Sequence, residues 1–532
     1  MKVLKCDEHP NEQVSLQDPT DTSLIPPIHS GMNIIILIGL LRWRLGMKRL
    51  SIQKFLNMKG INLSTGTISN RSLDFLLLFK QFHKSNVEEL KKFFGRQGGT
   101  ILHIDGTHKS GGKVSFVLQE GLSEITVDAA LISSEAEEYV TPLLSKFKDN
   151  YGPPLVIVRD MAKGLALSAS KVFSEVWQQI CQVHFIRDLE KNLLTGSHKS
   201  LKGSIVKHKL TKKLREFQNV SVGETNFKNL QRQWVHIAAD YLLHPVVKQL
   251  KWLSRPIPYH YQYGRVKEIA GLTKRIILWN AANNVMCRPL MDLDEILQRI
   301  LGDSNVYSNY RQLQRTLGWL EDVRTDLRLT RMNHLKDSSV DETDLHIVLK
   351  DIKARISTVS REGNELGGKY AGIAKKIVDA FERNWNELFV PDPVVNGARI
   401  RFKRHNNGLE SSHRRIRKSI RERTGKSETN HEMEQFGDLI AISSNLWNPK
   451  YQKEIMSDVG NLAASLSPFV EELPQLREKY RVARAGPEFP IADGKRKECL
   501  ELFVESLEAQ NQIDEIVHMN LPFVQENTFA VC

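Results

Sequence analysis

Residues 98–132, GGTILHIDGTHKSGGKVSFVLQEGLSEITVDAALI, and residues 155–160, LVIVRD, decide the fold class of this chain. The runs TILHID, KVSFVLQ and EITVDAAL have the length and the β-branched, apolar composition of strands, and the Gly-rich GTHKSGG is typical of a hairpin connection. LVIVRD predicts a short buried strand, because Gly152, Pro153 and Pro154 end the helix expected before it.

The segments between and after these strands predict helices. We expect helices over Glu135–Asn150 and Met161–Trp177, a fifth strand at ICQVHF (residues 180–185), and a further helix that begins with Ile186–Leu194. The resulting order is β-β-β-α-β-α-β-α, a three-stranded meander followed by crossover units. The sequence therefore predicts an α/β core with a mixed five-stranded sheet.

The residues before this core predict a group of helices. Ile34–Trp43 is apolar, and Leu50–Met58 predicts a second helix with Ser51 as its N-cap. After the Gly-containing turn KGIN, Ser64 or Thr65 opens a third helix, which is the helix-turn-helix pattern. An ordinary helical hairpin packed on its neighbours is the alternative. If the pattern reads DNA, the residues that face the bases are Thr65, Thr67, Ser69, Asn70 and Arg71.

The composition favours a folded chain with a polyanionic partner. The chain has 532 residues, of which 41% are hydrophobic and 26% charged, and this excludes global disorder. Lys and Arg number 75 and Asp and Glu 62, which gives a net charge of +13. The five cysteines include no CxxC pair, so we expect a reducing compartment and no disulfide framework or four-cysteine zinc site.

The sequence shows no segment that predicts membrane insertion. The longest apolar run, Ile34–Leu41, is far shorter than the roughly 20 residues that span a bilayer. A signal peptide is not expected either, because no charged start is followed directly by an apolar stretch. We therefore expect a cytoplasmic protein associated with the nucleoid or chromosome.

Six segments are expected along the chain. They are a flexible tail (1–30), the helix-turn-helix domain (31–95), the first part of the α/β core (96–195), an all-helical insertion of six to eight helices (196–398), the second part of the core (399–455) and a helical extension without assigned function (456–532). In the tail, Cys6 and His9 are too few to form a metal-binding module.

The helical segment contains several tryptophans. Such residues are more often core of a helix bundle than platforms on which unpaired bases stack, and both interpretations stay open. They are Trp234, Trp252, Trp279, Trp319 and Trp385.

Two aspartates, Asp105 and Asp160, end the strands TILHID and LVIVRD. Polar residues at the carboxyl ends of strands converge on a ligand crevice in α/β layers. Two buried carboxylates repel one another unless a cation lies between them, and Mg²⁺ prefers oxygen ligands of this kind. Each aspartate alone is more often the cap of the following turn. The pair favours a metal site.

A third carboxylate, Glu410, lies early in a strongly basic helix. Between Arg399 and Lys426 there are eleven Lys and Arg residues and two acids, Glu410 and Glu422. Glu410 could be a local salt-bridge partner, but this leaves the concentration of arginines unexplained. Arginine suits phosphate binding, and a solvated basic face is the alternative. The candidate DNA-binding residues here are Arg414, Arg415, Arg417, Lys418 and Arg421.

Four segments, taken in order, resemble the motifs of a known family. They are IDGTH (104–108), RDMAKG (159–164), CQVH (181–184) and NNGLESSHRRIRKSIRERTG (406–425). The chain resembles DDE transposases of the Mutator-like branch and their prokaryotic insertion-sequence relatives over about residues 31–450. Relatives often carry an N-terminal zinc module, of which only Cys6 and His9 remain here.

The resemblance implies a ribonuclease-H-like core with a helical insertion before the helix that carries the glutamate. It implies that Asp105, Asp160 and Glu410 are catalytic and hold two Mg²⁺ or Mn²⁺ ions for cleavage at transposon ends and strand transfer into target DNA. It gives Cys181 and His184 a supporting role beside the site, although they could equally form a plain strand end.

The resemblance also bears on His108, on the binding partner and on the assembly. His108 could approach a phosphate or be a surface residue of the hairpin. The partner would be double-stranded DNA, namely transposon terminal repeats and target DNA, and the joining of two ends implies a homodimer or larger assembly. Two other functions stay open. One is a non-catalytic regulator derived from a transposase, and the other is a ribonuclease-H-like nuclease.

Overall fold

The computed structural model describes residues 3–6, 9–15, 31–107, 113–220, 227–244, 252–253, 256–281, 286–329, 344–456 and 462–484. The chain divides into two units, Met1–Pro468 and Phe469–Cys532. Within the segment expected to be a tail, β1 (Val3–Cys6) pairs antiparallel with β2 (His9–Ser15), so these residues form a hairpin. In the second unit, the described part is mainly α19 (Leu473–Arg484).

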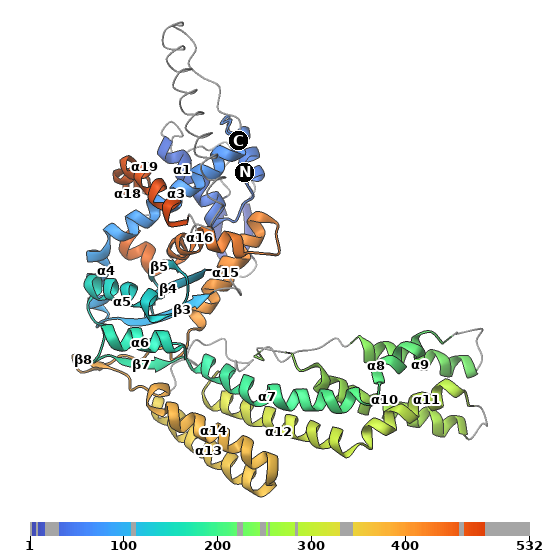
Figure 1. Cartoon of the computed structure of the whole chain (residues 1–532). Coiled ribbons are helices and arrows are strands. Elements are labelled where there is room, and N and C mark those ends of the chain that lie inside the picture. The colour runs from blue at the N-terminus through green and yellow to red at the C-terminus, as the bar shows by residue number, and fades with distance from the viewer. Residues whose placement is uncertain are drawn as a thin grey trace, which may run out of the picture. The chain divides into compact units, whose positions relative to one another are not determined.

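A mixed five-stranded sheet forms the centre of the first unit. Its strand order is β5-β4-β3-β6-β7, from β3 (Ile101–Thr107), β4 (Val114–Glu120), β5 (Thr126–Ile132), β6 (Val156–Arg159) and β7 (Trp177–Ile180). β4 runs antiparallel to both of its neighbours, β3 and β5, while β6 and β7 run parallel to β3. The predicted mixed α/β core is therefore confirmed (Figure 1).

Helices cover both faces of this sheet. Side chains alternate along a strand, so Asp105 and Thr107 of β3 point to one face and Gly106 to the other. On the first face, Arg417 of α15 (Asn407–Thr424) donates to Thr107 Oγ1 at 2.7 Å, and α16 (Asn430–Ser443) contacts β4 and β5. On the second face, α5 (Glu137–Tyr151) and α6 (Lys163–Val172) pack together and contact β5 and β6.

The predicted fifth strand at residues 180–185 is wrong beyond its first residue. β7 ends at Ile180, which is opposite Arg159, the last residue of β6. The Cys181 N–H still donates to the Arg159 carbonyl at 2.6 Å, and the chain then enters α7 (Gln182–Val206). The alternating pattern of ICQVHF resembles a strand, but Gln182 to Phe185 form the first turn of that helix. Similarly, α6 ends at Val172 and not at Trp177, because Phe173 leaves the helical conformation.

The N-terminal helices pack directly on the core. They are α1 (Gly31–Gly39), which continues as the π-helical turn η2 (Leu40–Arg44), then α2 (Arg49–Met58), α3 (Thr65–Ser85) and α4 (Val87–Arg96). Ser64 is the N-cap of α3, as predicted, with Oγ accepting from Thr67 N–H at 3.0 Å. Ser51 is not the N-cap of α2, since that helix begins at Arg49 after the extended residue Lys48.

Helix α3 is longer than the predicted stretch, and its second half joins the core. Ile68 packs with Ile38 and Ile52 of the preceding helices. Farther along, Lys80 forms an ion pair with Asp438 of α16 at 2.7 Å, and His83 bonds the Val127 carbonyl of β5 at 3.0 Å.

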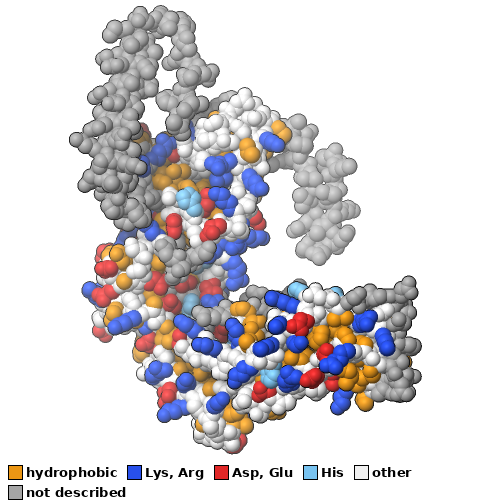
Figure 2. Space-filling model, turned by 45° about the vertical axis from the view of Figure 1, so that its right-hand side comes forward, with side chains coloured by type: hydrophobic (Ala, Val, Ile, Leu, Met, Phe, Trp, Pro, Cys, Tyr) orange, Lys and Arg blue, Asp and Glu red, His pale blue; other side chains and the backbone are white. Residues whose placement is uncertain are grey.

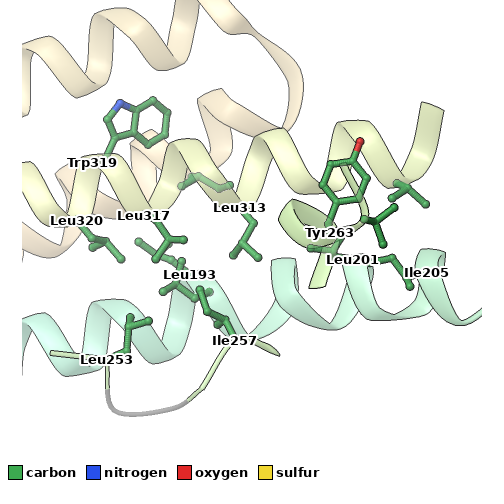
Figure 3. Close-up of a cluster of buried hydrophobic side chains, with 14 of the residues drawn as sticks. Leu193, Leu201, Ile205, Leu253, Ile257, Tyr263, Leu313, Leu317, Trp319 and Leu320 are labelled. Carbon is green, nitrogen blue, oxygen red and sulfur yellow. The ribbon is translucent and has the colours of Figure 1, made fainter. Parts of the chain in front are cut away.

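The helical segment after β7 has its own core, shared with α7. Its described residues form seven helices. They are α8 (Leu210–Gln218), α9 (Phe227–Leu243), α10 (Pro258–Ala281), α11 (Arg288–Leu301), α12 (Ser304–Asp326), α13 (Leu345–Leu366) and α14 (Gly368–Leu388). Figure 3 shows Leu193 and Leu201 of α7 facing Leu313 and Leu317 of α12 in this core.

The tryptophans of this segment do not share one environment. Trp319 is 2% exposed and donates from Nε1 to Glu362 at 2.8 Å, and Trp234, Trp252 and Trp385 are partly buried against the same core. Trp279, in contrast, is 57% exposed on α10, so the core interpretation is wrong for this residue.

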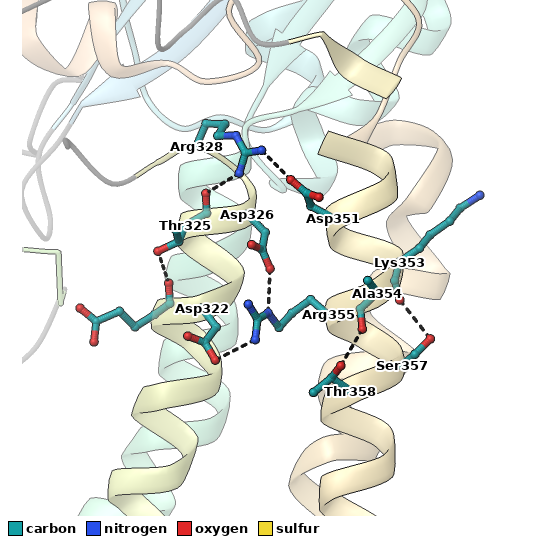
Figure 4. Close-up of polar contacts among 11 residues, drawn as sticks. Asp322, Thr325, Asp326, Arg328, Asp351, Lys353, Ala354, Arg355, Ser357 and Thr358 are labelled. Atoms are coloured by element: carbon teal, nitrogen blue, oxygen red, sulfur yellow. Dashed lines mark hydrogen bonds and ion pairs between the residues drawn. The ribbon is translucent and has the colours of Figure 1, made fainter. Parts of the chain in front are cut away.

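Ion pairs connect α12 to α13 at the end of this segment. Arg355 bonds Asp326 at 2.7 Å and Asp322 at 3.0 Å, and Arg328 pairs with Asp351 (Figure 4). Helix α14 then returns to the sheet, where Gln179 of β7 donates to the Leu388 carbonyl at 2.8 Å. The bond from Gln179 to Leu388 holds the end of α14 beside β7, the strand from which α7 departs.

A short hairpin and several short helices complete the described chain. The hairpin pairs β8 (Val394–Val395) with β9 (Ala398–Arg399) before α15. After α16 come η4 (Ser444–Trp447), α17 (Pro449–Tyr451), η5 (Gln452–Met456), α18 (Leu462–Leu466) and η7 (Ser467–Glu472). In the described part of the chain, every helix is too short or too polar to cross a bilayer.

Candidate active site

Asp105 and Asp160 lie side by side, but the prediction that Asp105 ends its strand is wrong, because β3 continues to Thr107 in its pairing with β4. β3 and β6 are parallel neighbours with His103 opposite Val158, and the same register continued by two residues places Asp105 beside Asp160. Asp105 is 5% exposed, whereas Asp160 is half-buried and accepts from the Ala162 N–H at 2.7 Å through Oδ1. This last bond is the cap-like contact that a lone aspartate would make. The pairing of the two strands is what brings both carboxylates to one edge.

Glu410 reaches the same region from the first turn of α15. Both of its oxygens accept hydrogen bonds from the guanidinium of Arg187 in α7, one of them at 2.9 Å. His184, one turn earlier on α7, has Nε2 at 3.7 Å from Glu410 Oε1. The structure thus brings together the CQVH segment and the glutamate helix, which are more than 200 residues apart in the sequence.

The charges of these groups interact strongly. Burial raises the pKa of Asp105 well above its ordinary value, and the charges of Glu410, Asp160 and Glu135 raise it further. Four carboxylates therefore lie close enough for mutual repulsion. Because repulsion of this kind is relieved by a proton or a cation, the region is a site that attracts positive charge.

Glu135, which sequence reasoning did not select, is the fourth of these carboxylates. Its Oε1 lies directly over Gly106, where a Cβ atom would come within 2.2 Å of it. Burial raises the pKa of Glu135 to about 7, and the charge of Asp160 contributes. The available signal was its position between the end of β5 at Ile132 and the start of α5 at Glu137.

Cys181 and His184 lie at the start of α7 and are surrounded mainly by other protein groups. Cys181 is fully buried, its Sγ accepts from the Asn406 N–H at 3.2 Å, and burial raises the pKa of its thiol to about 12. Burial therefore favours the neutral thiol in the metal-free protein. Burial lowers the pKa of His184, partly opposed by the charges of Glu410 and Asp160. Its Nδ1 is buried and has no hydrogen-bond partner among the described residues. His108 lies outside the described residues.

Asn406 ties the start of α15 to the strand that carries Asp105. Its side-chain amide donates to the Ile104 carbonyl at 3.0 Å and its Oδ1 bonds His103 Nδ1 at 2.9 Å. On the next turn, His413 has Nε2 at 4.0 Å from Asp105 Oδ2. Burial lowers the pKa of His413 to about 4, so it is neutral near pH 7 and does not pair with Asp105 as an ion. These contacts set the position of Glu410 relative to Asp105.

The basic residues of α15 are mainly at the surface. Arg414, Arg415, Lys418 and Arg421 are exposed, and Arg417 is half-buried. On the face shown in Figure 2, Lys and Arg side chains are interspersed with acidic and apolar ones. The positive charge is therefore not spread evenly over that face.

The candidate base-reading residues lie in the first two turns of α3. Asn70 is exposed, and Thr65, Thr67, Ser69 and Arg71 are half-buried. Arg71 pairs with Asp74 at 3.3 Å, and Thr67 Oγ1 bonds Ser64 Oγ at 2.9 Å. DNA reading by this turn stays a prediction.

A pocket of about 460 Å³ lies beside Asp160. It is lined by Asp160, Met161, Ala162, His184, Arg187, Asp188 and Lys191. The walls come from the loop after β6 and from the first three turns of α7. The pocket thus places Asp160 near the cationic side chains of α7. One of them, Arg187, also bonds Glu410.

The donor atoms of the site fit a hard divalent cation, but they do not converge on one point. Within the ranges that the structure describes, no three His, Cys, Asp or Glu side chains gather closely enough to hold a metal ion. Both oxygens of Glu410 instead accept hydrogen bonds from Arg187. The charges of Glu410, Asp160 and Glu135 act unfavourably on buried Asp105, and a bound cation would relieve this repulsion.

No protein-family model matches this chain, and no protein of curated function is significantly similar to it. The function is therefore inferred from the sequence motifs, the strand register and the contacts of the site.

Proposed function

We propose that this protein is a metal-dependent DNA transposase of the DDE type, with a ribonuclease-H-like core and an N-terminal helix-turn-helix. The observation that carries the proposal is that Asp105, inside β3, and Asp160, the residue after β6, come side by side when the register of these parallel strands is continued, with Glu410 close by. The helical segment between the sheet and α15 agrees with the expected insertion.

Three carboxylates would hold the cations, and a fourth lies nearby. Asp105, Asp160 and Glu410 are the proposed ligands, with Glu135 adding negative charge over Gly106. When bound, two Mg²⁺ or Mn²⁺ ions supply activation of the attacking oxygen and stabilisation of the leaving oxygen in phosphodiester cleavage and transfer. Asn406 and His103 set where Glu410 enters the site, and neutral His413 adds no positive charge that would compete with a cation at Asp105.

DNA would be bound by two separate surfaces. The start of α3 would read bases of the terminal repeats, and the exposed arginines of α15 would hold the backbone near the cut. Because two transposon ends must be joined, we expect a homodimer or larger assembly on DNA. Association with the nucleoid or chromosome would follow from the same contacts.

Substitution Asp105→Asn tests the proposal directly. We expect cleavage of transposon-end DNA to fall at least about a thousandfold, since a lost metal ligand removes several kcal/mol of transition-state stabilisation. Binding to the same DNA in a mobility-shift assay should stay nearly unchanged. The matched control is Asp149→Asn, an exposed aspartate of α5, which should cut at the wild-type rate. Wild-type cleavage by Asp105→Asn would contradict the assignment.

One observation favours a second function, a DNA-binding regulator derived from a transposase. The Arg187–Glu410 ion pair neutralises a proposed ligand and would suit a protein that no longer binds metal. Binding of terminal-repeat DNA without cleavage in Mg²⁺ or Mn²⁺ would support that function. A ribonuclease-H-like nuclease would instead cut RNA–DNA hybrids or junctions in the same screen.

A further inference from the structure

We propose that the pocket beside Asp160 is a phosphate subsite for the DNA strand, and that Arg187 exchanges Glu410 for a backbone phosphate when a divalent cation binds. This inference rests on the proposed function, because it assigns the substrate contacts of the same site. It makes Arg187 a residue with two successive partners, a carboxylate of the protein and then a phosphate of DNA.

Arg187 is placed between these two partners. It extends from α7 to both oxygens of Glu410, and it also lines the pocket. Its side chain is 39% exposed, so the guanidinium can reorient without unpacking the core. The planar guanidinium of arginine binds a carboxylate and a phosphate with the same two-bond geometry. Arg187 would therefore keep the same number of hydrogen bonds after the exchange.

Lys191 adds a second cation to the pocket, one turn after Arg187 on the same face of α7. It is exposed and has no ion-pair partner within the described ranges. The other charged wall residues are Asp160 and Asp188, and Asp188 already accepts from Asn192 at 2.8 Å. The two cationic and two anionic side chains of the pocket walls balance in charge. A divalent cation bound at Asp160 would therefore give the pocket a net positive charge.

The release of Glu410 follows from the same geometry. A carboxylate with both oxygens bonded to one guanidinium binds a metal ion less well, because one lone pair of each oxygen is already used and the two cations repel one another. A cation at Glu410 would displace Arg187, and the freed guanidinium already forms a wall of the pocket. The pair is partly solvent-exposed, with 17% of the Glu410 side chain accessible, so breaking it costs much less than breaking a fully buried pair.

The first measurement is the salt dependence of DNA binding. Full-length wild type, Arg187→Ala and Lys191→Ala are titrated with a short fluorescent duplex in Ca²⁺, which takes oxygen ligands as Mg²⁺ does. Each variant should bind more weakly, and the slope of log K against log salt should fall by about one for each lost phosphate contact. The control is Lys376→Ala, an exposed lysine of α14, whose slope should equal that of wild type.

The second measurement is Mn²⁺ affinity without DNA, by calorimetry. Arg187→Ala should bind Mn²⁺ several-fold more tightly than wild type, because the competing cation is gone, and Arg187→Lys should fall between them. Lys191→Ala should leave Mn²⁺ affinity unchanged. An Arg187 that serves only as a structural tie would instead lower the melting temperature without tightening Mn²⁺ binding or changing the salt slope.

These outcomes separate the inference from the proposed function. Unchanged slopes in both Arg187→Ala and Lys191→Ala overturn the subsite, even if Asp105→Asn shows that the protein is a transposase. Reduced slopes together with tighter Mn²⁺ binding support the subsite. If a protein with that result fails to cut transposon ends, the transposase proposal falls and the phosphate subsite stands.

Discussion

At the scale of single residues, the least expected finding is Glu135. Its carboxylate is two residues upstream of α5 and over Gly106, and its pKa of about 7 exceeds the ordinary 4.5 because of burial and of Asp160. A carboxyl with a raised pKa in the folded state costs stability as pH rises from about 4.5 through about 7, and the full cost is present above that range.

Glu135→Gln should therefore stabilise the metal-free protein at pH 8 by about 2 kcal/mol, discounted because Glu135 is partly exposed. The gain should disappear below about pH 4.5, where wild-type Glu135 becomes protonated in both the folded and the unfolded state. Urea unfolding at several pH values measures this difference. Added Mg²⁺ should stabilise wild type more than Glu135→Gln. An equal effect of Mg²⁺ on both proteins would exclude Glu135 from the cation site.

At the scale of elements, the start of α3 shows how one cap positions a candidate DNA-reading turn. Ser64 Oγ accepts from Thr67 N–H at 3.0 Å, so Ser64→Ala should lower the stability of this helix by about 1 kcal/mol. Ser51, the other serine that the sequence suggested as a cap, lies inside α2 and provides the control. Ser51→Ala should leave the melting temperature and DNA affinity nearly unchanged. Equal destabilisation by the two variants would contradict the assigned cap.

At the scale of the first unit, side chains more than 350 residues apart join the N-terminal helices to the core. Lys80 of α3 pairs at 2.7 Å with Asp438, which is 4% exposed. Lys80→Met should cost about 3 kcal/mol, because it leaves a buried carboxylate without this cation. Lys92→Met removes a pair at the surface, with Glu89, and should cost less than about 1 kcal/mol. Denaturant unfolding compares the two, and equal losses would show that α3 is not held by this contact.

Several features of the fold and the site could be predicted from local sequence. The strands at 101–107, 114–120 and 126–132 and the cap at Ser64 depend on neighbours a few residues away, which a pattern records. The end of β7 could not be predicted, because it is set by the length of its partner β6. For Glu135, the only local signal was its position between a strand and a helix, and this does not show that it lies over Gly106 and near Asp160, which lie elsewhere in the sequence.

By itself, the sequence determined the α/β class, the helical segment after the sheet and the presence of an aspartate near the end of each of two strands, because composition and periodicity are local properties. Only the tertiary structure decided which charges meet. Strand register sets Asp105 beside Asp160, Asn406 ties α15 to β3, and Arg187 rather than a second carboxylate faces Glu410. Electrostatic energy depends on distance in space, and residues far apart in the chain acquire that distance only when the chain folds.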